Sequence, residues 1–201
     1  TPRSSESRDD LLVRAAFAYP VASPIEQIVV SATGATLLLA DIQARLVQDA
    51  EVTGLALFGN ETDEVITGSS ADDLLLGGLG ADLIDGGAGN DIFGDVGADG
   101  TSDILTGGAG RDTYRFVPVY NLPEDFVADV ITDFAAGNGG DIIRLASSNP
   151  NPFELGLLRL AQEGADSVLV ATTDSGAEKI VLRLIGVDSA LLTAANFGGL
   201  P

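Results

Sequence analysis

Hydrophobic positions between residues 59 and 116 recur every nine residues, which is the spacing of neither a helix nor a long strand. Each unit holds one apolar or aromatic residue at its eighth position, in the middle of a three-residue segment. The six residues before that segment are glycine-rich, and glycine adopts the positive φ of tight turns without steric cost. Short strands therefore alternate with turns, and one side chain per strand points inward. The inward residues are Ile66, Leu75, Ile84, Phe93, Leu105 and Tyr114.

An acidic residue stands two places before each of these inward positions. It is Glu64 in the first unit and aspartate in the later ones, namely Asp73, Asp82, Asp91, Asp103 and Asp112. If two units complete one coil of eighteen residues, Asp73 stacks over Asp91, Asp91 over Asp112, and Asp82 over Asp103. Three extra residues within 95–100 keep both stacks in register. A flexible Gly/Asp linker is the alternative, but a linker has no need for an apolar residue after every aspartate.

Stacked carboxylates repel each other by about 4 kcal/mol per close pair at an effective dielectric near 20. A hard dication with oxygen ligands, held by carboxylates and turn carbonyls, removes this repulsion. Calcium accepts six or more oxygens in irregular geometry, whereas magnesium needs a near-ideal octahedron and retains water. The pattern therefore favours calcium.

These units resemble the glycine-rich nonapeptide GGxGxDxUx of RTX proteins, which binds calcium. The resemblance is strongest at the units that begin at Gly77, Gly86 and Gly107. It implies an all-β fold with a right-handed parallel β-roll over residues 59–116 and calcium as the cofactor, with three to four ions in two rows. The segments 129–134 and 140–145 are similar to those that follow the last repeat in this family. The β-rich segments between residues 158 and 197 look like the end of type I secretion substrates.

The resemblance also implies a ligand set. Carboxylates would come from Asp73, Asp82, Asp91, Asp103 and Asp112, and main-chain carbonyls from Gly77, Gly78, Gly80, Gly86, Gly87, Gly89, Gly107, Gly108 and Gly110. Asp129 resembles a late calcium ligand of some relatives, and the alternative is a surface acid. Residues 60–62 and 69–71 depart from the glycine pattern, which weakens the match at the first site, between the turns at 59 and 77.

Charge and composition exclude several classes of function. The 30 acidic and 10 basic residues give a formal net charge of -20, which disfavours nucleic acid and anionic membranes as partners. Histidine and cysteine are absent, so a catalytic triad, a histidine base and a thiolate metal site cannot form. No apolar stretch has the length of a membrane span. Only carboxylate-pair chemistry stays open, and we predict that this chain is not itself an enzyme.

Four regions are expected. Residues 1–24 form a linker or a loosely ordered segment, and 25–58 an N-terminal flank or cap with short strands at 28–30 and 37–39 and a short helix after Asp41. Residues 59–116 form the calcium-binding roll. Residues 117–201 form a C-terminal cap, with an antiparallel meander over 155–186, and the type I secretion signal region.

The sequence therefore predicts a calcium-binding module of a larger secreted or cell-surface bacterial protein. It would fold on calcium binding after export and would contact the type I secretion machinery through its C-terminus. Two alternatives stay open: the anchoring region of an adhesin or surface-layer protein, and the tail of a secreted hydrolase whose catalytic domain lies upstream. Because the chain starts at Thr1 without a signal-peptide pattern, it is expected to be a fragment or a processed product.

Overall fold

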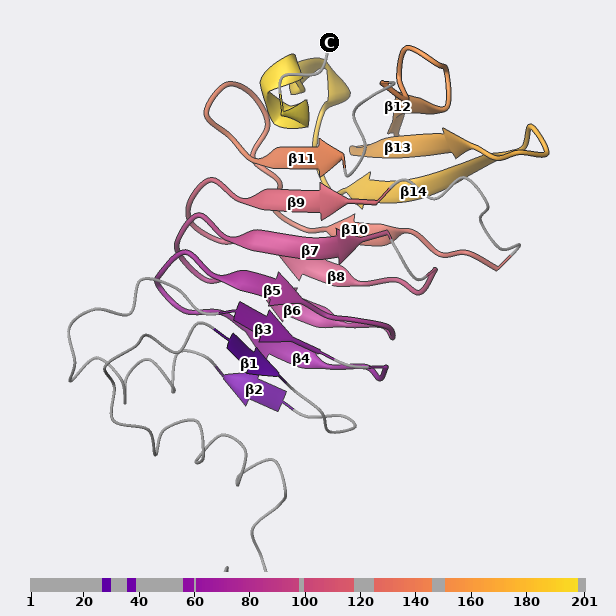
Figure 1. The fold of residues 1–201 in the computed structure, drawn as a ribbon. Coiled ribbons are helices and arrows are strands. Elements are labelled where there is room, and N and C mark those ends of the chain that lie inside the picture. Colours follow the sequence, from indigo (N-terminus) through magenta and orange to yellow (C-terminus); the bar gives the residue numbers. More distant parts are fainter. Residues whose placement is uncertain are drawn as a thin grey trace, which may run out of the picture.

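Two β-sheets face each other in the computed structural model, and from β1 to β11 successive strands alternate between the two sheets (Figure 1). The structure describes residues 27–29, 36–38, 56–59, 61–97, 100–117, 125–145 and 151–198. The expected linker at 1–24 and the expected helix after Asp41 lie outside these residues.

One sheet consists of the odd-numbered strands from β1 to β11, which all run parallel. These strands are β1 (Gln27–Val29), β3 (Ala56–Phe58), β5 (Leu74–Leu76), β7 (Ile92–Val96), β9 (Thr113–Phe116) and β11 (Ile142–Leu145). The facing sheet contains in parallel β2 (Thr36–Leu38), β4 (Val65–Thr67), β6 (Leu83–Asp85), β8 (Ile104–Thr106) and β10 (Asp129–Ile131). This arrangement is the predicted β-roll, and its parallel sheets extend beyond residues 59 and 116 in both directions.

The core lies between the sheets and is built from one inward side chain per short strand. All six predicted inward residues are buried, with 0–2% of their surface exposed. Phe93 and Tyr114, one coil apart, stack with ring centroids 4.8 Å apart. The register confirms the expected place of the three-residue insertion. Ile84 still pairs with Leu105, and the pairing of β7 with β9 shifts by one residue between Phe93 and Val96.

The C-terminal cap is the predicted antiparallel meander. Its strands are β12 (Leu158–Glu163), β13 (Asp166–Thr172) and β14 (Glu178–Leu184). β14 pairs in parallel with β10, so the cap extends the even-numbered sheet of the roll. Two 3₁₀ turns, η1 (Ser189–Leu191) and η2 (Ala194–Phe197), follow, and η2 packs against β11.

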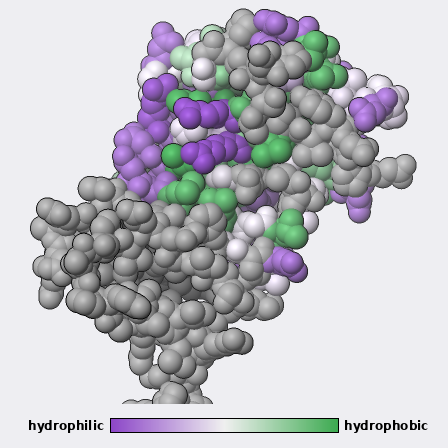
Figure 2. Space-filling model, in the orientation of Figure 1, coloured by the Kyte–Doolittle hydropathy of each residue, from purple (hydrophilic) through white to green (hydrophobic). Residues whose placement is uncertain are grey.

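The surface of the roll is mixed in character. On the face turned to the viewer in Figure 2, hydrophobic and hydrophilic side chains alternate in small patches over the described strands. Within the described part of the chain, no helix has the length and apolar character to cross a membrane.

Candidate metal centre

Eight acidic side chains form two rows, one along each edge of the roll. The first row is Asp73, Asp91, Asp112 and Asp141, and the second row is Glu64, Asp82, Asp103 and Asp129. All eight are buried, although carboxylates are rarely buried without a partner. The rows confirm the predicted stacking of Asp73 over Asp91, of Asp91 over Asp112, and of Asp82 over Asp103.

Backbone amides hold one oxygen of each carboxylate in a repeating ladder. Asp91 Oδ1 accepts the amide N–H of Asp73 at 2.8 Å, and Asp112 Oδ1 accepts that of Asp91 at 2.9 Å. Each carboxylate after the first of its row thus accepts the amide of the acidic residue one coil earlier. The same pattern continues to Asp141 in the first row and to Asp129 in the second. One amide neutralises little of a full negative charge, so the ladder fixes the position of the acids and leaves their repulsion in place.

The ends of the rows differ from their middle in how the second oxygen is satisfied. Asp73 Oδ2 accepts hydrogen bonds from the amide and the hydroxyl of Ser69, both at 2.8 Å. Asp141 Oδ2 accepts the amide of Ala135 at 2.8 Å, and Asp129 Oδ2 accepts that of Gly97. The serine that departs from the glycine pattern therefore provides a donor to the carboxylate at the start of the first row.

Asp91 lies in the middle of the first row, and its second oxygen has no such donor. Asp91 Oδ2 is buried and receives no hydrogen bond from the residues that the structure describes. Burial, together with the neighbouring Asp73 and Asp112, raises the pKa of Asp91 to about 7. Burial, with Asp141 and Asp133 nearby, likewise raises the pKa of Asp112 to about 6. A cation beside these carboxylates would restore their charged form.

The glycine that opens each turn lets oxygen atoms approach the backbone closely. A Cβ atom built on Gly86 would lie 2.5 Å from Asp91 Oδ2 and 2.6 Å from the carbonyl oxygen of Gly107. A Cβ atom on Gly77 would lie 2.0 Å from Asp82 Oδ2. Only glycine allows this close approach, and at Gly86 the oxygens come from two successive turns of one row. Glycines 78, 80, 87, 89, 108 and 110 have positive φ and shape these turns.

These donors fit calcium. They are carboxylate and carbonyl oxygens from different turns, without nitrogen or sulfur, which matches a hard ion of flexible coordination. Among the described residues, no group of three or more acidic side chains is arranged to hold a metal. Each position would therefore combine single carboxylates with main-chain oxygens. That the residues named from the sequence are the ligands stays a prediction.

Sequence reasoning missed some residues of these rows and misjudged one. Asp129 is only 1% exposed and receives two amide hydrogen bonds, so the interpretation as a surface acid is wrong. Asp141 extends the first row and was not anticipated, although it too stands two places before a buried residue, Ile143. Asp133 was also missed, and it accepts the amides of Gly107 and Gly108 at 2.8 Å.

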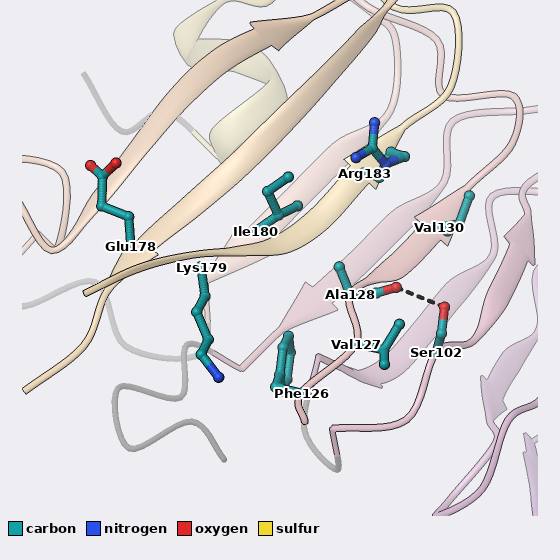
Figure 3. A pocket seen from close by; sticks show the side chains of 9 residues that line it. All are labelled: Ser102, Phe126, Val127, Ala128, Val130, Glu178, Lys179, Ile180 and Arg183. Atoms are coloured by element: carbon teal, nitrogen blue, oxygen red, sulfur yellow. Dashed lines mark hydrogen bonds between the residues drawn. The ribbon is translucent and has the colours of Figure 1, made fainter. Parts of the chain in front are cut away.

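A surface pocket lies apart from the rows, between β10 and β14 (Figure 3). Phe126, Val127 and Ile180 give it an apolar lining, and the Ser102 hydroxyl at its edge donates to the carbonyl of Ala128. Its one carboxylate, Glu178, is ion-paired with Arg159. This pocket therefore does not provide the pair of carboxylates that glycoside hydrolysis needs.

Comparisons with known proteins agree with this geometry. The RTX calcium-binding nonapeptide repeat, in four copies, matches residues 58–93 and 97–113. The solution structure of the AlgE6R2 subunit of the Azotobacter vinelandii mannuronan C5-epimerase is similar, with 28% sequence identity and a TM-score of 0.50 over 70% of this chain and 89% of that one. The AlgE6R3 subunit of the same enzyme matches with the same identity and TM-score, over 69% of this chain and 79% of that subunit. No curated protein matches the sequence.

Proposed function

This chain carries RTX calcium-binding nonapeptide repeats, and from that premise we propose that its β-roll is a calcium-dependent folding module of a larger secreted protein. The buried, unbonded Oδ2 of Asp91 carries this proposal. The ladder brings negatively charged carboxylates together in the middle of the first row. Asp91 Oδ2 receives no hydrogen bond from the described residues that would offset this repulsion. Folding without a cation therefore requires these acids either to repel each other or to take up protons.

Bound calcium supplies the positive charge between successive turns, and the chain's residues determine how many ions fit. We propose three to four ions, held by the middle carboxylates of both rows together with glycine carbonyls. At a calcium concentration about tenfold above a dissociation constant near 10⁻⁴ M, each ion contributes about 1.4 kcal/mol. The sum is of the order of the whole stability of a small domain, so calcium would determine whether the roll folds.

A calcium titration of the chelator-treated chain tests this function. Far-UV circular dichroism is expected to change from coil to β as calcium approaches the millimolar range, and magnesium at equal concentration should have little effect. Hydrogen exchange would locate the change in residues 59–116. A roll that keeps its spectrum and its protected amides in excess chelator would disprove the proposal.

We also propose that the region after the repeats directs export through a type I secretion system before the roll folds. The support is the resemblance of the segments between residues 158 and 197 to such signals. Low cytosolic calcium would keep the acidic repeats unfolded and able to pass through a channel. In a host with a type I system, the chain lacking residues 189–201 should stay inside the cells. Equal export of the full and the shortened chain would contradict this proposal.

A further inference from the structure

Two oxygens meet beside the opening glycine at successive turns of the first row. At Gly68, a Cβ atom would lie 2.1 Å from the Gly86 carbonyl oxygen and 3.2 Å from Asp73 Oδ2. At Gly86 the corresponding pair is the carbonyl oxygen of Gly107 and Asp91 Oδ2. At both turns, one carboxylate oxygen of the same turn and one carbonyl oxygen of the turn one coil later lie beside the opening glycine.

The last turn of this row has a different pair of oxygens beside its opening glycine. The atoms closest to the Cβ position of Gly107 are Asp112 Oδ2, at 2.3 Å, and the hydroxyl oxygen of Tyr114, at 2.6 Å. The following segment, from Ala135 to Asp141, is not a nonapeptide turn, and none of its carbonyls is among the three atoms closest to this point. At Gly86 the ring end of Phe93, Cζ, lies 3.1 Å from the same position, so the Tyr114 hydroxyl extends that ring position by one oxygen at a turn where no carbonyl oxygen lies close.

Packing does not explain this hydroxyl. Tyr114 is 0% exposed, and its hydroxyl has no hydrogen-bond partner among the described residues. A buried polar group without a partner costs about 1–3 kcal/mol. Phe93 occupies the corresponding position one coil earlier and stacks on Tyr114, so a plain phenyl ring fits this core. The hydroxyl must offset its cost through something that binds beside Gly107.

The acidic surroundings define the charge of that ligand. Asp112 provides the adjacent oxygen, and Asp133 and Asp141 lie close enough to act on Tyr114 electrostatically. We propose that the Tyr114 hydroxyl is the neutral oxygen ligand of a calcium ion at the last turn of the first row, where no glycine carbonyl lies beside the opening glycine. This inference rests on the proposed calcium-dependent function and adds a side-chain ligand to it.

Tyr114→Phe tests the inference because it removes one oxygen and keeps the ring. Equilibrium dialysis of the full chain at saturating calcium should show one bound ion fewer than in the wild type, with a higher calcium midpoint for folding. Tyr19→Phe and Tyr120→Phe, the chain's other two tyrosines, should change neither value and are the matched controls. An unchanged ion count and midpoint in Tyr114→Phe would overturn the inference. Absence of calcium binding by the wild type would instead overturn the proposed function.

A second measurement keeps the inference testable if Tyr114→Phe does not fold. In the double variant Tyr19→Phe/Tyr120→Phe, Tyr114 is the only tyrosine. The chain has no tryptophan, so excitation of tyrosine then excites Tyr114 alone. Terbium, which replaces calcium at oxygen sites, should then emit when tyrosine is excited, because this transfer falls steeply with distance. Bound terbium without tyrosine-sensitised emission would contradict a ligand role for Tyr114.

Discussion

Acidic side chains meet opposite environments in the roll and in the cap. In the roll, burial raises the pKa of Asp91 to about 7, and the neighbouring carboxylates act in the same direction. In the cap, the amide of Gly186 and the guanidinium of Arg183 lower the pKa of Asp166. Arg183 also pairs with Glu163, and Arg159 pairs with Glu178 across the antiparallel strands. The cap thus carries its own cations, whereas the middle of the first row has to obtain one from solution.

This difference assigns distinct roles to the roll and to the cap. β10 and β14 are hydrogen-bonded neighbours, yet the acids near β14 are neutralised by the chain itself. On the proposed function, the cap forms without metal, whereas the folding of the roll depends on the calcium concentration. Each prediction below changes one side of the comparison and uses the other as its control.

The largest effect is expected from filling the space beside Gly86. Gly86→Ala places a methyl group against Asp91 Oδ2 and the Gly107 carbonyl, and its φ is not positive, so the backbone tolerates alanine. Overpacking costs about 1–3 kcal/mol, and the lost ion costs about 1.4 kcal/mol more. Calcium-dependent circular dichroism should show a much higher midpoint, and dialysis should show fewer bound ions.

Gly164→Ala in the turn between β12 and β13 is the control. Gly164 has a φ of 65° and nothing within 4 Å of its Cβ position, so alanine adds backbone strain alone, about 1–2 kcal/mol. The number of bound ions should stay that of the wild type. If both variants lose the same number of ions, the space beside Gly86 is not a metal position.

The next effect separates the middle of the first row from its end. Asp91→Asn removes charge from an oxygen without a donor, so it should weaken calcium binding and make the metal-free roll more stable than the wild type. Asp141→Asn replaces an acceptor of two amides, at 2.8 and 2.9 Å, and should cost about 1–3 kcal/mol with or without calcium. Urea unfolding in calcium and in chelator measures both. If the stability of the two variants depended equally on calcium, the proposed difference between Asp91 in the middle of the row and Asp141 at its end would be wrong.

Much of this fold could be predicted from spacing alone, because the nonapeptide period determines both the turns and the inward side chains. Asp141 escaped because 29 residues separate it from Asp112, while the earlier members of its row are 18 and 21 apart. That Ser69 donates hydrogen bonds to Asp73 could not be predicted either. In the sequence, Ser69 is only a departure from the glycine pattern, and the pattern does not show where its hydroxyl points. Tyr114 was predicted as a core residue, and only the geometry beside Gly107 reveals where its hydroxyl lies.

Acidity should act on the two regions in opposite directions. The folded-state pKa values of Asp91 and Asp112, about 7 and 6, lie above the ordinary value of 3.8. Protonation therefore stabilises the metal-free roll, fully below pH 3.8 and progressively less as the pH rises through 6 and 7. In chelator, lowering the pH from 8 to 5 should restore part of the β signal, and in calcium it should raise the calcium midpoint. The cap should keep its stability between pH 8 and 5 and lose it only below about pH 3.8, because the pKa of Asp166 is lowered and its charged form is the stabilising one.

The smallest effect belongs to the ion pairs of the cap. Arg183→Met keeps an unbranched apolar stem and removes the guanidinium contacts with Glu163 and Asp166. Partly exposed pairs of this kind contribute about 0.2–1 kcal/mol, so urea unfolding at saturating calcium should shift by no more than that. Arg115→Met is the matched control, because Arg115 is exposed on β9 and forms no ion pair with the residues that the structure describes. Neither variant should change the number of bound calcium ions. A lost ion in Arg183→Met would show that the cap, too, depends on the metal, and the contrast between the two regions would then be wrong.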